Sequence, residues 1–138
     1  MRYTRTHEWV EREEDDIAAI GISSRAKEIF GEVVFVELPE EGEELEQDDP
    51  LGSIETVDGE VVTIHSPITG EVIEVNHILE NSPDLVNRSP EGDGWFVKMR
   101  MESPKEIGAL MTLEEYEEYE EEDFLEDEED FEDEEEYI

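Results

Sequence analysis

The stretch "IETVDGEVVTIHSPITG", from Ile54 to Gly70, holds two segments rich in β-branched residues on either side of Asp58-Gly59. Aspartate followed by glycine between two such segments is a strong signal for a tight β-hairpin. A type I′ turn requires positive φ at both central residues, and this dipeptide tolerates that conformation. We therefore predict a type I′ hairpin with the charged Asp58 at its tip.

The sequence on both sides of this hairpin predicts a mainly β protein. Short strands are expected where β-branched and aromatic residues gather, at residues 7–11, 17–22, 32–38, 69–76 and 94–101. A short helix is expected in "SRAKEIF", capped by Ser23 or Ser24 and ended by Gly31.

Near the end of the β region, Ser-Pro pairs mark further helix starts. Ser82-Pro83 and Ser103-Pro104 each combine a serine cap with proline at the first helical position. Thr112 and Glu115 have the spacing of a capping box for a last helix, with Leu113, Tyr116 and Tyr119 expected to face the body.

Length and composition exclude several classes of protein. The 138 residues correspond to one domain, and the lack of cysteine excludes disulfides, thiolate metal sites and a cysteine nucleophile. The first residues show no signal peptide, and no apolar run approaches the roughly 20 residues of a membrane helix. We expect a cytoplasmic protein that does not enter a membrane.

The charge is strongly acidic, with 45 Asp and Glu against 9 Lys and Arg and a net charge of −36. Residues 114–138 carry no basic residue and hold half of that net charge. Nucleic acids and anionic lipids are bound mainly through Lys and Arg, so neither is an expected partner. Basic protein surfaces are expected partners. The plainer explanation of the charge is a solvated acidic surface adapted to salt or heat.

Blocks of sequence along the chain resemble, in order, the glycine cleavage system H proteins. They are "THEWV" at 6–10, "GEVVFVELPEEGEE" at 31–44, "SPITGEVIEVN" at 66–76, "LVNRSPEGDGWFVKM" at 85–99 and the Ser-Pro pair at 103. The resemblance covers residues 3–119. It implies a lipoyl/biotinyl-type domain, or barrel-sandwich hybrid, over residues 1–119. The acidic tail, 120–138, lies outside it, and we expect it to be frayed or to order only against a partner.

The resemblance also implies a function. In this family a hairpin displays a lysine that carries lipoic acid. The lipoyl arm takes an aminomethyl group from the pyridoxal-phosphate-dependent glycine decarboxylase and passes it to the folate-dependent aminomethyltransferase. Dihydrolipoyl dehydrogenase then reoxidises it. The H protein is a mobile carrier with no catalytic site of its own, so we expect no enzyme activity here.

The hairpin departs from the family at its tip. The family reads Glu-Ser-Val-Lys-Ala where this chain reads Glu-Thr-Val-Asp-Gly at 55–59, so Asp58 stands at the lysine position. The only lysines are Lys27, Lys98 and Lys105, and the return strand is one residue longer before Ser66 than the family pattern. A carboxylate cannot form the lipoyl amide, so we expect no cofactor. Asp58 is expected to adopt the left-handed region and to form local hydrogen bonds.

Few other residues suggest chemistry. The resemblance places Thr6 and Glu8 beside the cleft in which the family's loaded arm docks, but the plainer alternative is that both residues merely finish a strand edge. Trp9 is expected in the core. His7, His65 and His77 follow no metal-ligand spacing, and no nucleophile and base are paired, so neither a metal site nor a catalytic site is predicted.

Two functions remain open. The chain is either a non-lipoylated binding or regulatory module for glycine-cleavage or lipoate-attachment enzymes, or a working carrier of the aminomethyl group. A weaker third possibility is an enzyme that reuses the arm cleft.

Overall fold

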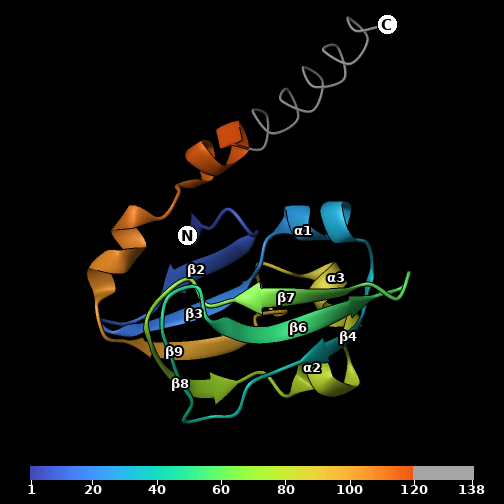
Figure 1. The fold of residues 1–138 in the computed structure, drawn as a ribbon, viewed down its shortest axis with the longest axis horizontal. Helices are drawn as coiled ribbons and strands as arrows, with labels where there is room; N and C mark the ends of the chain where they lie inside the picture. Colours follow the sequence, from blue (N-terminus) through green and yellow to red (C-terminus); the bar gives the residue numbers. More distant parts are fainter. Residues whose placement is uncertain (120–138) are drawn as a thin grey trace, which may run out of the picture.

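The computed structural model describes residues 1–119, which form two antiparallel β-sheets with short helices around them (Figure 1). The expectation for the tail, 120–138, lies outside the described residues. The larger sheet has the strand order β1 (Arg2–Tyr3), β2 (Glu8–Arg12), β3 (Ile17–Ile22), β9 (Val97–Met101), β8 (Gly70–Val75) and β5 (Glu44–Leu45). The smaller sheet has the order β4 (Val33–Glu37), β6 (Pro50–Thr56) and β7 (Val61–His65).

The helices are short and lie around the sheets rather than between them. They are α1 (Ser24–Phe30), α2 (Ile78–Asn81), α3 (Asp84–Arg88), a 3₁₀ helix (Pro104–Ala109) and a last helix at 113–119. The mainly β, barrel-sandwich fold and the expected strands are confirmed. None of the helices in the described part of the chain is both long and apolar enough to cross a membrane.

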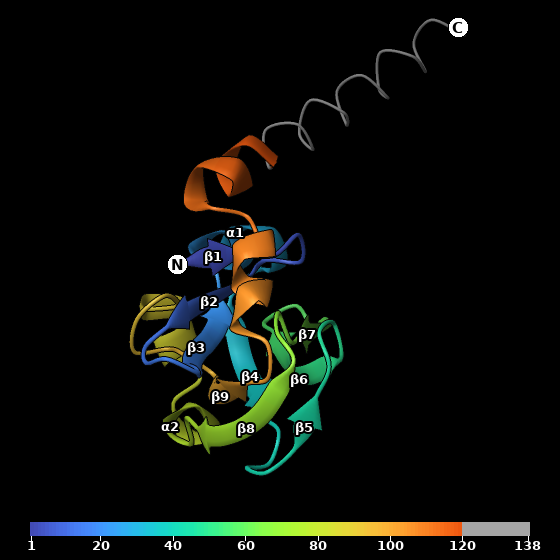
Figure 2. The same cartoon turned by 90° about the vertical axis from the view of Figure 1, so that its left-hand side faces the viewer.

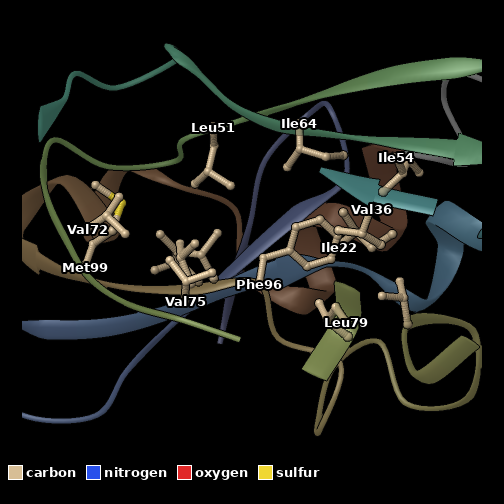
Figure 3. Close-up of a cluster of buried hydrophobic side chains, with 14 of the residues drawn as sticks. Ile22, Val36, Leu51, Ile54, Ile64, Val72, Val75, Leu79, Phe96 and Met99 are labelled. Atoms are coloured by element: carbon tan, nitrogen blue, oxygen red, sulfur yellow. The ribbon is translucent and has the colours of Figure 1, made fainter. Parts of the chain in front are cut away.

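The core lies between the two sheets, as Figure 3 shows. Leu51, Ile54 and Ile64 of the smaller sheet point into the space between the sheets, Val72 and Met99 of the larger sheet also lie in this core, and all five are buried. Side chains alternate along a strand, so inward-facing Ile54 and Thr56 leave Glu55 on the outer face. This alternation determines which residues of the hairpin reach solvent.

Trp9 belongs to a second buried cluster, as predicted. Its side chain is 2% exposed, and its indole Nε1–H donates to the carbonyl of Pro90 at 2.9 Å. A Cβ on Gly21 would lie 2.9 Å from the Trp9 ring, so only glycine lets the ring lie against β3. Trp9 is therefore unavailable as a stacking platform for a ligand.

The start of α1 differs from the prediction. Ser23 precedes the helix, but its side chain makes no capping bond, and its hydroxyl lies 2.7 Å from the Tyr116 hydroxyl. The carboxylate of Glu91 caps the helix instead, accepting from the Ser24 N–H at 2.8 Å. Gly31 ends the helix with φ of 99°, as expected.

The last helix begins at the predicted capping box. The Glu115 N–H donates to the Thr112 hydroxyl at 3.2 Å, and the Thr112 N–H donates to the Glu115 carboxylate at 2.9 Å. Tyr116 is buried and stacks on Tyr3, with ring centroids 4.6 Å apart. Leu113, predicted to face the body, is 52% exposed, so that part of the prediction is wrong.

Candidate functional site

The β6–β7 hairpin forms as expected, but with a different turn. The Gly59 N–H donates to the Thr56 carbonyl, and the Thr56 N–H donates to the Glu60 carbonyl, both at 2.9 Å. Only Gly59 has positive φ, at 85°, whereas Asp58 does not. The tip is thus a three-residue loop closed by a left-handed glycine, and the predicted type I′ turn is wrong. The loop supplies one more residue than a two-residue turn, so Asp58 keeps an unstrained backbone.

Asp58 is exposed at the end of the hairpin. Its carboxylate makes no hydrogen bond to any described residue, so the expected local bonding by Asp58 is also wrong. The carboxylate lies beside Gly31, where a Cβ would be 3.9 Å from Asp58 Oδ2. A side chain in this position projects to solvent and contributes little to folding.

The backbone of the tip is held by the chain that follows α1. The Val57 N–H donates to the Glu32 carbonyl at 2.8 Å, and Val33 pairs with Thr56 across β4 and β6. Thr56 is 1% exposed, and its hydroxyl has no partner in the described structure. The hairpin therefore presents a rigid tip with an exposed side chain, the arrangement that a tethered group needs.

Thr6 and Glu8, the two residues assigned to the arm cleft, do lie together. The Glu8 side chain is 1% exposed, and its Oε1 accepts hydrogen bonds from the hydroxyls of Thr6 and Thr4, each at 2.5 Å. A buried carboxylate requires such donors because its desolvation is costly. Glu8 is therefore a buried, hydrogen-bonded carboxylate and not merely a residue at a strand edge, whereas Thr6 is exposed.

Glu8 links the two sheets through its other carboxylate oxygen. Glu8 Oε2 accepts from the His65 N–H at 3.1 Å and lies 3.7 Å from His65 Nδ1. His65 ends β7, so Glu8 contacts the end of this strand that is farthest from the Asp58 tip. At about 3.3 Å per residue, the length of β7 separates the two by roughly 15 Å. Asp58 is thus not brought together with Thr6 and Glu8.

Sequence reasoning missed the contacts of Thr4 and His65 with Glu8. Thr4 lies four residues before Glu8, and His7 between them has a φ of 74°, which is rare outside glycine. His65 lies far along the chain on the other sheet. No local pattern signals this pairing, because it depends on how the two sheets pack.

His7 faces away from Glu8, toward the last helix. Its Nδ1 lies 2.6 Å from the Tyr116 hydroxyl, which is also bonded to Ser23. His77, the third histidine, lies 3.6 Å from Glu41 and 3.2 Å from Glu80 on the exposed surface. The three histidines occupy separate places, and no group of three metal-binding side chains occurs within residues 1–119.

Known proteins resemble this chain along most of its length. Residues 1–123 match the family model of the glycine cleavage H-protein. The glycine cleavage system H protein of Vibrio cholerae is 45% identical over 123 residues, covering 89% of this chain and 97% of that relative. The mitochondrial H protein of Drosophila melanogaster is 47% identical over 118 residues, covering 86% of this chain and 71% of the relative.

A solved structure agrees. The crystal structure of a glycine cleavage system H protein from Mycobacterium marinum superposes with a TM-score of 0.74 at 32% identity. The superposition covers 83% of this chain and 91% of the Mycobacterium marinum chain. With the two-sheet fold and the displayed hairpin, these matches show that the chain belongs to the glycine cleavage H-protein family, whose members are carriers without a catalytic site of their own.

Proposed function

We propose that this chain is a non-lipoylated member of the H-protein family. In this proposal it acts as a binding or regulatory module for glycine-cleavage or lipoate-attachment enzymes. The observation that carries the proposal is the exposed Asp58 at the tip of an otherwise complete hairpin. A carrier needs a primary amine at such a tip, and this tip holds a carboxylate.

The family carries lipoate, but the residues present here do not fit that group. Lipoate is attached by an amide bond to a lysine amine, and residues 28–97 contain no lysine. The three lysines belong to α1, β9 and the 3₁₀ helix, and Lys98 pairs with Glu13 at 3.0 Å. The proposal therefore includes no lipoyl group and no chemistry that depends on one.

What would remain is the surface that H proteins present to other enzymes. Partners in this proposal are glycine decarboxylase, aminomethyltransferase, dihydrolipoyl dehydrogenase or a lipoate-attachment enzyme. Thr6 and Glu8 would line the arm-docking cleft that the family resemblance implies, with Glu8 held by Thr4 and His65. We propose a cytoplasmic location for the protein.

The acidic segment, 120–138, would be a separate unit that adds electrostatic attraction to a basic partner. Attraction between exposed charges weakens as salt shortens the Debye length from about 10 Å at 0.1 M. Removing residues 120–138 should therefore weaken partner binding at low salt and have little effect at high salt. Binding that is insensitive to both changes would remove this role for the tail.

The alternative function, a working aminomethyl carrier, is favoured by the identity of 45–47% to H proteins. A reconstituted glycine-cleavage assay separates the two. We expect this chain to support no turnover on its own and to inhibit turnover supported by a lipoylated H protein. The inhibition should be relieved by more lipoylated protein. Turnover with this chain alone would establish the carrier, and lack of inhibition at large excess would contradict the binding module.

A further inference from the structure

The outer face of the smaller sheet is open to solvent. In Figures 1 and 2 no described element lies over the side of β4, β6 and β7 that faces away from the core. Phe35 pairs with Glu55, and Glu55 pairs with Val61, so these three side chains form one row across the three strands. Side chains paired in this way point to the same face of a sheet.

This row is apolar at both ends and exposed. Phe35 is 55% exposed and Val61 is 64% exposed, and Val57 in the adjoining hairpin loop is 61% exposed. Single exposed apolar side chains are common, but a group of them on one open face marks an interaction surface. Phe35, Val57 and Val61 with Glu55 between them are called the hairpin face below.

The surroundings of the hairpin face are acidic. Glu32, Glu37, Asp58 and Glu60 are all exposed around it. No Lys or Arg occurs in the sequence between Lys27 and Arg88, a stretch that includes all three strands. Among the described residues, Glu55 forms no ion pair, so its charge is available to a partner.

We propose that the hairpin face docks a partner protein whose contact surface has an apolar centre bordered by Lys and Arg. The proposal deepens the proposed function and rests on it, because the partner is one of the glycine-cleavage or lipoate-attachment enzymes. Charge complementarity selects the chemistry: apolar contact supplies affinity, and the acidic border attracts a basic rim. A second copy of this chain would bring the same negative charge and is disfavoured.

The test measures direct binding of the full chain to four purified enzymes: glycine decarboxylase, aminomethyltransferase, dihydrolipoyl dehydrogenase and a lipoate–protein ligase. The variants are Phe35→Ser, Val61→Thr and Glu55→Gln, all at outward positions. Matched controls are Ile78→Thr, at a residue on α2 that is 62% exposed, and Glu44→Gln, at an exposed residue on β5. Circular dichroism and thermal unfolding verify that each variant is folded.

We expect at least one enzyme to bind. The Phe35 and Val61 variants should weaken that binding by about tenfold or more, as for residues near the centre of an interface. Glu55→Gln should mainly lower the association rate and its salt dependence. The two controls should stay within about twofold of the unmodified chain.

Each of the other possible results contradicts either the docking surface or the proposed function. Binding that the hairpin-face variants leave unchanged would overturn this surface while leaving the proposed function in place. Binding to none of the four enzymes would overturn both. Sedimentation that shows a dimer, dissociated by the Phe35 and Val61 variants, would assign the face to a second copy and also overturn the proposal.

Discussion

Gly59 is the residue of the hairpin tip whose backbone lies in the left-handed region, with φ of 85°. A side chain there is strained, whereas Asp58 is exposed and has an ordinary backbone. Gly59→Ala should lower the free energy of unfolding by about 1 kcal/mol or somewhat more. Asp58→Ala, one residue away, should change it by less than about 0.5 kcal/mol. Urea unfolding of the two variants measures both, and equal losses would contradict this assignment of the turn.

The Tyr116 hydroxyl is a second single group on which the packing depends. It lies 2.6 Å from His7 Nδ1 and 2.7 Å from the Ser23 hydroxyl, and the Tyr116 side chain is 2% exposed. Tyr116→Phe should therefore destabilise the fold by about 1–2 kcal/mol, since it leaves buried polar groups without their partner.

Tyr119 provides the matched control for Tyr116. Its hydroxyl donates a long, exposed hydrogen bond of 3.5 Å to the Arg5 carbonyl. Tyr119→Phe should change the free energy of unfolding by less than about 0.5 kcal/mol. Thermal unfolding of the pair decides the point, and similar effects of both substitutions would show that the buried hydroxyl has no special role.

At the scale of elements, the capping box couples the last helix to pH. The Thr112 N–H donates to Glu115, and this hydrogen bond holds the pKa of the Glu115 carboxyl below its usual value. A carboxyl whose pKa is lowered in the folded state stabilises that state above its unfolded pKa and loses this effect as pH falls through the folded value.

Glu115→Gln should therefore destabilise the protein near neutral pH. The difference from the unmodified chain should shrink as the pH is lowered from about 5 to about 2. Unfolding measured across that range tests the sign. A difference that stays constant with pH would show that the carboxylate charge does not matter to the helix start.

The elements themselves were largely predictable from the sequence, because strands and helix ends are signalled locally. Alternating β-branched segments predicted β6 and β7, and Thr112 with Glu115 predicted the last helix. The type of the hairpin turn was not predictable, because Asp-Gly suits both a type I′ turn and a three-residue loop with a left-handed glycine. The contacts of the loop with the Glu32 carbonyl are not visible in the dipeptide.

Longer-range contacts account for the other differences. Ser23 or Ser24 was expected to cap α1, but the carboxylate of Glu91, distant in sequence, accepts from the Ser24 N–H while the Ser23 hydroxyl bonds to Tyr116. At the candidate site, Thr6 and Glu8 were identified through resemblance; the Thr6 hydroxyl donates to Glu8, and their role beside an arm cleft stays a prediction. The link from Glu8 to His65 depends on the packing of two sheets, which no local pattern encodes.

At the scale of the whole molecule, the net charge of −36 opposes compactness through self-repulsion. Screening should relieve it, so raising salt from about 0.05 M to about 1 M should raise the Tm. Near pH 4.1, the sequence pI, the same addition should have a much smaller effect because the net charge is near zero. Calorimetry at the two pH values provides the comparison, and a Tm that falls with salt at pH 7 would contradict this view of the charge.

The proposed function depends on the hairpin tip, where we expect the Asp58 carboxylate to stand in place of the amine that lipoyl attachment needs. The most direct test is the intact mass of the full chain after coexpression with a lipoate–protein ligase and lipoate. Asp58→Lys should be expressed in parallel, since a lysine fits the unstrained backbone there. The account predicts an unmodified mass for the natural chain and an added lipoyl mass for Asp58→Lys. A lipoyl group on the natural chain, at Lys27 or any other residue, would contradict it.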